Sequence, residues 1–325
     1  MKTEILTLLR ETDGYVSGQE LCEKFGVSRT AVWKAINQLK EAGYEIEAVQ
    51  NKGYRLVSVP DILSESELQS VRKTRWIGEK IAFFDVVDST NTRAKQLAEE
   101  GAPNGTYVIA ERQDAGKGRR GRGFDSPAGQ GIWMTLVLKP EIDPNHASMI
   151  TLVTALAVSK AITDMTGRPA SIKWPNDIIM SGKKVCGILT EMSAQFDYVN
   201  HIVVGIGINV QNKSFPKDIE SVATSLFMET KEHYHRAGLV ERIWEAFEHY
   251  YEIFLQTEDL SGLVNEYNSH LVNMHQQVKV LDPKEPFEGK AMGITPKGEL
   301  IVDTWESRKL VSTGEVSVRG IYGYV

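Results

Sequence analysis

The chain has 325 residues, 42% of them hydrophobic and 25% charged, which is typical of a globular protein with more than one domain. The formal net charge of −6 excludes a general attraction to nucleic acid, so any DNA contact has to be local. Both cysteines, Cys22 and Cys186, lie among apolar residues, and neither a signal-like start nor an apolar run of membrane-spanning length is evident. We therefore expect a cytoplasmic protein without disulfides.

The first sixty residues predict a winged helix-turn-helix. Apolar residues at helical spacing, with an N-capping serine before the second and third segments, indicate helices at 5–14, 17–26 and 28–43. Residues 44–57 alternate around a turn that contains glycine, which predicts a β-hairpin, the wing.

The third of these helices leaves polar and cationic side chains on its outer face. Such side chains can reach phosphates and base edges. Residues 1–60 carry eight cations and eight carboxylates and are neutral, but basic residues lie on the third helix and the wing. A winged helix used for protein contacts alone is the alternative. The residues predicted to contact DNA are Ser28, Arg29, Thr30, Trp33, Lys34, Asn37, Lys52 and Arg55.

Beyond a connector, the chain predicts alternating strands and helices and then a small β-rich end. A short helix is expected within 64–73, and an aromatic-rich core helix at 235–257. The polar segment 211–224 has the composition of a mobile loop that closes over a ligand. Short alternating segments from Gln277 onward predict a β-barrel of roughly fifty residues. The other expected elements are strands at 80–87, 106–112, 132–138, 171–179, 183–191 and 198–204, with helices after Ser89 and at 146–166.

Residues 116–122, Gly-Lys-Gly-Arg-Arg-Gly-Arg, place four cations among three glycines between two expected strands. Glycine lets the backbone approach a ligand closely, and arginine binds phosphate or carboxylate in a bidentate manner. The glycine spacing also matches a dinucleotide-binding fingerprint, but that motif needs a helix after the loop, and here a second strand follows. A solvated basic loop is the simpler alternative. In the company of the motifs below, the loop is predicted to hold an anionic ligand.

Four further clusters place polar residues or glycines at the ends of strands or inside them. Ser89–Asn91 follows a strand, although Ser89 or Thr90 can equally be a helix N-cap. Lys173–Asp177 is broken by a proline, for which a surface turn is the alternative. Lys184, taken alone, is explained by a solvated turn. The glycines within Gly205–Asn209 suggest a bulge or a close backbone approach.

Together these motifs resemble bifunctional biotin protein ligases of the bacterial type, which also repress the biotin operon. The shared motifs are Ser89–Asn91, Gln113, Gly116–Arg122, Lys173–Asp177, Lys184 with Gly187, and Gly205–Asn209. One departure is Lys117, where the family often has arginine; the charge is kept but the bidentate geometry is not.

The resemblance covers the whole length and implies an α+β protein with three domains. The expected parts are a winged helix-turn-helix DNA-binding domain at 1–60, a connector at 61–75, a mixed-sheet ligase domain similar to class II aminoacyl-tRNA synthetases at 76–272, and an SH3-like β-barrel at 273–325.

The resemblance also implies a two-step reaction with a regulatory product. Biotin and ATP would give biotinyl-5′-AMP and pyrophosphate, with Mg²⁺ neutralising phosphate charge. Biotin would then pass to a lysine of biotin carboxyl carrier protein, in acetyl-CoA carboxylase or pyruvate carboxylase. Biotinyl-5′-AMP would order the glycine-rich loop and favour a homodimer. That dimer would bind operator DNA and repress genes for biotin synthesis or transport, and no membrane partner is expected.

Individual residues acquire roles from the same resemblance. Catalysis is expected from Lys184, Arg119 and Arg122, which would stabilise charge developing at the α-phosphate. Biotin binding is expected from Ser89, Thr90, Asn91, Gln113, Lys117, Gly118, Arg119, Lys184 and Gly187. Nucleotide binding is expected from Arg119, Arg122, Lys173, Trp174, Asn176 and Asn209, and Asp177 is the candidate near Mg²⁺.

Two other functions compete with this interpretation. A lipoate-type ligase shares the activated-acid chemistry, but it does not normally carry a winged helix. A ligand-sensing transcription factor without catalysis would not need the cation-rich loop, Lys184 and the 174–177 motif together.

Overall fold

The computed structural model describes residues 1–282, 285–313, 317–320 and 324–325. These residues form two compact units. The first contains residues 1–73 and 235–241, and the second contains residues 74–234 and 242–325. The domain boundaries predicted at 60, 75 and 272 stay predictions.

The first unit is a winged helix-turn-helix, as the sequence predicts. Ser17 caps the second helix by accepting a hydrogen bond from the Glu20 amide, and Ser28 caps the third by accepting one from Ala31. The apolar faces of the three helices and the first wing strand share one core. The elements are α1 (Lys2–Glu11), α2 (Gly18–Phe25), α3 (Arg29–Glu41), β1 (Glu45–Val49), β2 (Gly53–Ser58) and the connector helix α4 (Glu65–Val71).

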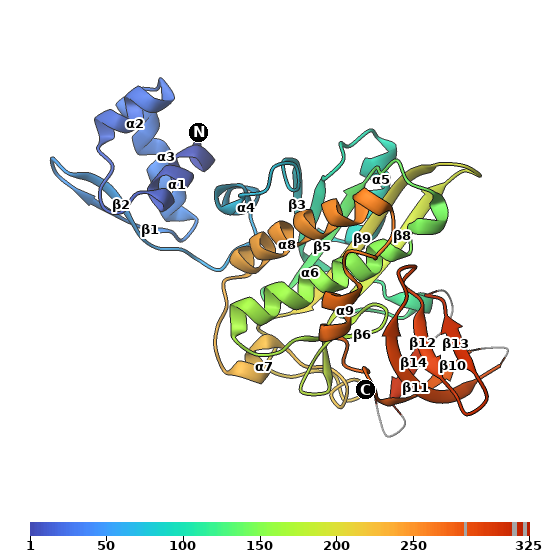
Figure 1. Ribbon diagram of the computed structural model, residues 1–325. Coiled ribbons are helices and arrows are strands. Elements are labelled where there is room, and N and C mark those ends of the chain that lie inside the picture. The colour runs from blue at the N-terminus through green and yellow to red at the C-terminus, as the bar shows by residue number, and fades with distance from the viewer. Residues whose placement is uncertain (283–284, 314–316, 321–323) are drawn as a thin grey trace. The chain divides into compact units, whose positions relative to one another are not determined.

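The second unit is built on a mixed sheet of seven strands in the order β3-β4-β5-β9-β8-β7-β6 (Figure 1). Its first two strands are parallel and every later pair is antiparallel. The central strand β5 is buried along its whole length, as its continuous apolar run indicates. The strands are β3 (Ile81–Val87), β4 (Tyr107–Gln113), β5 (Gly131–Leu138), β6 (Ser171–Lys173), β7 (Asp177–Met180), β8 (Lys183–Ala194) and β9 (Val199–Asn209).

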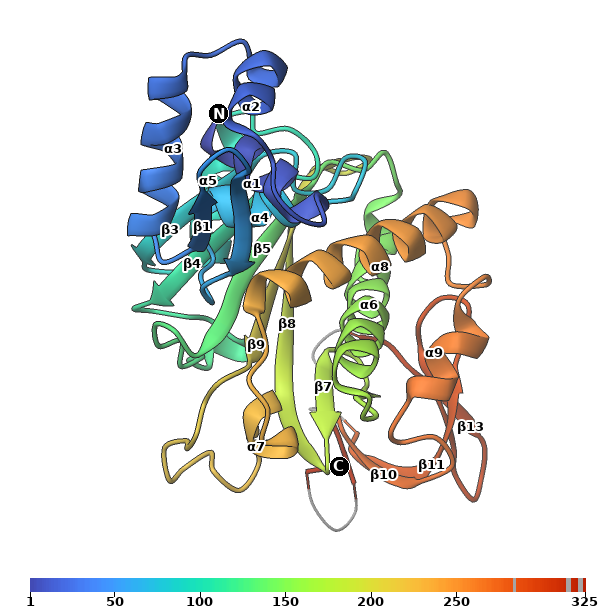
Figure 2. The same ribbon diagram turned by 90° about the vertical axis from the view of Figure 1, so that its left-hand side faces the viewer.

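Helices cover this sheet (Figure 2), and helices and strands both supply its buried apolar residues. Helix α5 (Thr90–Glu99) packs against β4, β5 and β9, and α6 (Met149–Thr166) packs against β6, β7 and β8. The aromatic side chains of α8 (Arg236–Thr257) are buried, which confirms that they belong to the core. Short helices α7 (Leu226–Thr230) and α9 (Val264–His270) also occur, and neither was expected from the sequence.

Segment Pro144–Thr166, which includes α6, corrects one expectation from the sequence. It is long and apolar enough to cross a membrane by length and composition, although the sequence analysis finds no such run. Its apolar side chains are buried inside the second unit, which is the behaviour of a core helix.

The C-terminal part forms an antiparallel sheet of five strands in the order β13-β12-β11-β10-β14. Strand β13 was missed, because its four residues alternate cationic and apolar side chains next to a polar turn. The sequence also predicts a strand at 314–320, of which residues 314–316 lie outside the described residues. The strands are β10 (Gln277–Leu281), β11 (Phe287–Ile294), β12 (Leu300–Asp303), β13 (Arg308–Val311) and β14 (Ser317–Gly320).

Candidate active site

The parallel pair β3 and β4 brings the Ser89–Asn91 cluster next to Gln113. Helix α5 starts directly after β3, and Gln113 ends β4, so both lie at the carboxyl edge of the pair. Gln113 Oε1 accepts hydrogen bonds from the Thr90 amide at 2.8 Å and from the Thr90 hydroxyl at 3.0 Å. Neither Ser89 nor Thr90 caps α5 with its side chain, so the capping alternative fails.

Asn91 is held by one buried partner, Thr135, and one half-buried partner, Glu191. Its Oδ1 accepts from the Thr135 hydroxyl at 2.7 Å, and its Nδ2 donates to Glu191 Oε2 at 2.8 Å. Gly205 leaves the room for Asn91, because a Cβ at that position would collide with the Asn91 amide. Glycine in β9 therefore serves the close approach of a side chain, where the sequence suggested a bulge or a close backbone approach. Both ends of the Asn91 amide are therefore hydrogen-bonded within the protein.

The glycine-rich loop joins β4 to the antiparallel β5. Its closing hydrogen bonds run from the Gly118 amide to the Arg122 carbonyl at 2.7 Å and from the Phe124 amide to the Gly116 carbonyl at 2.9 Å. Residues 114–130 are all described, and they contain only the three-residue 3-10 turn Arg119–Gly121. Without a helix after the loop, a dinucleotide-binding fold is excluded.

The adjacent strands β6, β7 and β8 carry a second group of predicted site residues, which are charged. Lys184 Nζ lies 2.6 Å from Asp177 Oδ1, and Lys173 stands directly opposite Asp177 in the β6–β7 register. Burial lowers the pKa of Lys173 to about 8. Burial alone would raise the pKa of Asp177, but Lys184 and other neighbours hold that pKa below its ordinary value. Asp177 is therefore an anion surrounded by cations.

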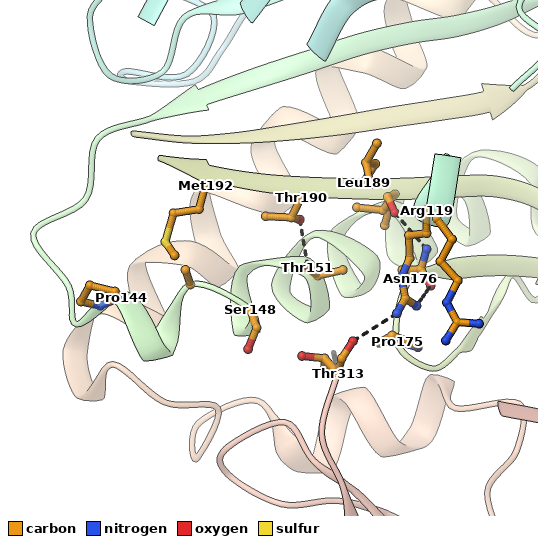
Figure 3. Close-up of a pocket in the computed structure, with 13 residues that line it drawn as sticks. Arg119, Pro144, Ser148, Thr151, Pro175, Asn176, Leu189, Thr190, Met192 and Thr313 are labelled. Carbon is orange, nitrogen blue, oxygen red and sulfur yellow. Dashed lines mark hydrogen bonds between the residues drawn. The ribbon is translucent and has the colours of Figure 1, made fainter. Parts of the chain in front are cut away.

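Arg119 lines a cavity of about 440 Å³ and is held by hydrogen bonds to two other residues that line it (Figure 3). Its Nη1 donates to Asn176 Oδ1 at 2.9 Å, and its Nη2 donates to the Thr313 carbonyl at 3.2 Å. Asn176 Nδ2 in turn donates to the Ile188 carbonyl at 3.0 Å. The C-terminal part thus helps to orient a loop arginine.

Most of the predicted site residues meet in two adjoining pockets. The first, called the polar pocket, has uncharged polar side chains and three cations; the second, called the cationic pocket, is lined mostly by cations. The two pockets share Gly118, Arg119, Phe124, Asn176 and Lys184. The predicted residues that line the polar pocket are Ser89, Thr90, Asn91, Gln113, Lys117, Gly118, Arg119, Asn176, Lys184 and Gly187. Those that line the cationic pocket are Gly118, Arg119, Arg122, Lys173, Asn176, Asp177 and Lys184.

Two predicted nucleotide contacts lie away from these pockets. The Trp174 indole is buried and donates from Nε1 to the Gly298 carbonyl at 3.0 Å. Asn209 is 7% exposed, and its Nδ2 donates to the Thr224 carbonyl at 3.1 Å. Both side chains hold the fold here, so their contact with a nucleotide stays a prediction.

Sequence reasoning missed several residues that complete the site. Thr135 was hidden in an apolar strand, and Tyr324 lies 147 positions from its partner Asp177, so local patterns gave no signal for either. Phe124 stands beside the loop motif and packs its ring over Gly207, where a Cβ would come within 2.7 Å. Arg319 and Thr313 also line these cavities.

Asp177 does not have the surroundings of a metal ligand. One of its oxygens is paired with Lys184 and the other accepts from the Tyr324 hydroxyl at 2.6 Å. Among the described residues, no group of three or more His, Cys, Asp or Glu side chains is arranged to hold a metal ion. The donor set at Asp177 therefore does not fit Mg²⁺, and the role of Asp177 near that ion stays a prediction.

The first unit presents its predicted DNA contacts to solvent. Trp33 is 56% exposed on α3, and Arg55 on the wing pairs with Glu47 at 2.7 Å. A groove of about 460 Å³ between α3 and the wing is lined by Arg29 and Lys52. Ser28 is exposed but its hydroxyl is used in capping α3, and Asn37 is half-buried. The side chains of Thr30 and Lys34 are also exposed.

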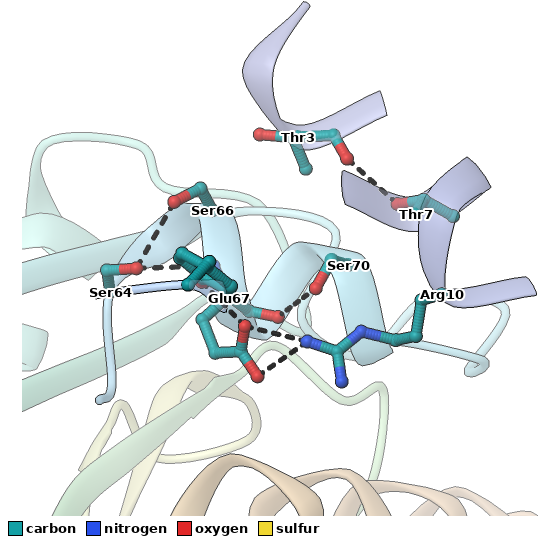
Figure 4. A network of polar contacts seen from close by, with 8 residues as sticks. Thr3, Thr7, Arg10, Ser64, Ser66, Glu67 and Ser70 are labelled. Carbon is teal, nitrogen blue, oxygen red and sulfur yellow. Dashed lines mark hydrogen bonds and ion pairs between the residues drawn. The ribbon is translucent and has the colours of Figure 1, made fainter. Parts of the chain in front are cut away.

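The connector helix α4 is anchored inside this first unit (Figure 4). The buried Glu67 carboxylate accepts from Arg10 Nη2 at 2.8 Å and from the Tyr44 hydroxyl at 2.6 Å. Burial, followed by the Glu67 contact, raises the pKa of Tyr44 well above its ordinary value. A buried ion pair with a third partner ties α4 to α1 and to the segment before the wing.

Comparisons with known proteins agree with this arrangement. The biotin/lipoate A/B protein ligase family model matches residues 83–209, an HTH domain model matches 2–55, and a biotin protein ligase C-terminal domain model matches 276–319. The bifunctional ligase/repressor BirA of Bacillus subtilis is 40% identical over 94% of each chain. Its counterpart in Escherichia coli is 27% identical over 93% of this chain and 92% of that one.

A solved structure of a biotin protein ligase resembles a large part of this chain. The biotin protein ligase from Aquifex aeolicus in complex with biotin and ATP is 30% identical, with a TM-score of 0.66. The match covers 74% of this chain and 99% of that one. With its ligase, C-terminal and helix-turn-helix parts all matched, the chain belongs to the family of bifunctional biotin protein ligases and repressors.

Proposed function

We propose that this chain joins biotin to the AMP moiety of ATP, transfers biotin to a carrier protein and represses transcription when biotinyl-5′-AMP is bound. In the first step, a biotin carboxylate oxygen attacks the α-phosphorus of ATP and pyrophosphate leaves. In the second, the ε-amine of a lysine on biotin carboxyl carrier protein attacks the acyl carbon and AMP leaves. Neither step needs a covalent enzyme intermediate, so positioning and charge stabilisation carry the catalysis.

The observation that carries this proposal is the junction of the polar pocket, with its uncharged Ser89, Thr90 and Gln113, and the cationic pocket. A ureido ring has donors and an acceptor that hydroxyls and amides can match, and the Thr90–Gln113 pair offers such groups. The cations next to it suit a carboxylate and a triphosphate. Because both pockets share Arg119 and Lys184, the two reacting groups would meet between these side chains.

Individual roles follow from this division. Lys184 would stabilise charge on the α-phosphate, with Arg119 and Arg122 on the phosphates. Ser89, Thr90 and Gln113 would hold the ureido ring, and Lys117 the carboxylate side. Asn91, Gly118 and Gly187 would shape the biotin pocket. Lys173, Trp174, Asn176 and Asn209 are proposed at the nucleotide, and Mg²⁺ would enter with the ATP phosphates.

Exchange of labelled pyrophosphate into ATP tests this assignment. The full chain is assayed with biotin, lipoate and octanoate in turn. We expect exchange with biotin alone. Exchange with lipoate or octanoate in place of biotin would favour a lipoate-type ligase, and exchange with no acid would favour a ligand sensor without catalysis.

The DNA-binding unit extends the proposal to regulation. The exposed cations on α3 and the wing suit operator DNA, and the adenylate would order the glycine-rich loop and favour a homodimer in the cytoplasm. Sedimentation with and without biotinyl-5′-AMP tests the dimer. Slower amide exchange in residues 116–131 on addition of biotin and ATP is expected, and equal rates would count against loop ordering.

A further inference from the structure

The cationic pocket is closed by a side chain that comes from outside the central sheet. The Tyr324 hydroxyl donates to Asp177 Oδ2 at 2.6 Å, while Asp177 Oδ1 faces Lys184 at 2.6 Å. The two oxygens of one carboxylate are therefore divided between a tyrosine and a lysine. A carboxylate held at both oxygens cannot rotate freely.

The ring of the same tyrosine contacts a second cation. Lys173 Nζ lies 3.3 Å from the centre of the Tyr324 ring, in a cation–π arrangement. Lys173 is 5% exposed, so water screens this contact little. Tyr324 thus touches the anion through its hydroxyl and a neighbouring cation through its face.

We propose that Tyr324 is a positioning residue for the ligase reaction, which fixes Asp177 and Lys173 so that Lys184 stands at the reacting centre. The inference rests on the proposed function. Lys173, Asp177 and Lys184 stand on the three adjacent strands β6, β7 and β8, so the sheet sets their spacing. Together with Lys184, Tyr324 restrains the rotation of the carboxylate, which the sheet does not fix.

Loss of the hydroxyl would free Asp177 Oδ2. The carboxylate could then rotate toward Lys173 or bind the Lys184 ammonium through both oxygens. Either change would move that ammonium. The charged and titratable groups around Asp177 are Lys173, Lys184, Arg119, Cys186 and Tyr324, with Arg120, Arg122 and Arg319 lining the same pocket.

The test compares full-length Tyr324→Phe with Tyr250→Phe. Tyr250 also donates its hydroxyl to a carboxylate, that of Glu266, but it belongs to α8 and lines neither pocket. Biotin-dependent pyrophosphate exchange is measured from pH 3 to 9, a range that includes the ordinary aspartate pKa of 3.8, and kcat and the ATP KM are determined separately. For Tyr324→Phe, we expect kcat to fall roughly tenfold, because a hydrogen bond to a charged group is lost. Tyr250→Phe should keep the wild-type kcat.

The pH profile separates positioning from a merely structural role. Burial raises the pKa of Asp177, whereas Lys184 and, to a lesser extent, the Tyr324 hydroxyl lower it. Removing its hydroxyl raises that pKa, so the acidic limb of kcat should move to higher pH. A lower kcat with an unmoved acidic limb and a lower melting temperature would assign Tyr324 to folding alone and overturn the proposal.

A second variant tests the ring. Tyr324→Leu removes both the hydroxyl and the face under Lys173, so its ATP KM should rise above that of Tyr324→Phe. Equal KM values would remove the ring from the proposal.

Wild-type kcat and pH profile in Tyr324→Phe would overturn the positioning role alone, whereas no biotin-dependent exchange by the wild-type chain would overturn the proposed function itself.

Discussion

The recognition face of the winged helix and the cationic pocket both gather lysine and arginine, but their surroundings are opposite. On the wing, the Arg55 side chain is 47% exposed and pairs with Glu47 at the surface. In the pocket, Lys173 is 5% exposed and several cations share one carboxylate. Water and salt screen the first set, whereas burial strengthens every interaction in the second. The same residue types therefore suit a long external polyanion in one unit and a small enclosed phosphate in the other.

Replacing a pocket cation should have the largest effect. We expect Lys184→Ala to lower biotin-dependent pyrophosphate exchange by about 10²- to 10³-fold, as loss of a transition-state donor does. The neighbouring Lys183→Ala is the control, since Lys183 donates to the Glu220 carbonyl and lines neither pocket. Equal activity of the two variants would remove Lys184 from the site and erase the contrast between buried and exposed cations.

Removing a hydrogen bond between uncharged groups of the polar pocket should have a smaller effect. Thr90→Val keeps the shape but leaves Gln113 Oε1 without a hydroxyl donor. Gln113 Oε1 keeps the Thr90 amide as a donor, so the variant loses one neutral hydrogen bond, worth about 0.5–1.5 kcal/mol, and the biotin KM should rise roughly threefold to tenfold. The ATP KM should stay near the wild-type value. A rise in the ATP KM alone would reverse the assignment of the two pockets.

The pH dependence of nucleotide binding sharpens the comparison further. Burial lowers the pKa of Lys173 to about 8, so this side chain is charged below pH 8 and loses its charge as the pH rises through that value. The ATP KM of the wild-type chain should therefore increase several-fold between pH 7 and 9, because one charge-assisted contact with a phosphate is lost. In Lys173→Arg the guanidinium stays charged, and the increase should disappear. A rise of the same size in both proteins would place the titrating group elsewhere.

Exposed cations of the first unit should give the smallest change per residue. Lys34→Ala should weaken operator binding roughly threefold to tenfold and reduce the slope of log affinity against log salt by about 1, because one phosphate contact is lost. Fluorescence anisotropy at several salt concentrations measures both quantities. Adenylation by this variant should match that of the wild type. An unchanged salt slope would mean that Lys34 does not touch the DNA backbone.

Local patterns predicted the elements well where one short stretch decides the structure. The capping serines, the apolar strand β5 and the aromatic side chains of α8 are read directly from neighbouring residues. The glycine-rich loop could be recognised as a candidate site because its composition is unusual over seven residues.

Contacts between distant segments could not be predicted in this way. Asn91 was expected to touch biotin, yet its amide is engaged by Thr135 and Glu191. Trp174 and Asn209 carry polar atoms that look available in sequence, but the fold directs them to carbonyls of other segments. Nothing around Tyr324 indicates that its hydroxyl meets Asp177.

A single-turnover reaction tests the central claim most directly. The full chain, in excess over ATP labelled at the α-phosphate, is mixed with biotin in the absence of any carrier protein, and the bound nucleotide is identified by chromatography and mass spectrometry. The account predicts that the label appears in biotinyl-5′-AMP, with release of pyrophosphate, and that addition of carrier protein converts it to AMP. Formation of ADP, or label that stays in ATP when biotin is present, would contradict it.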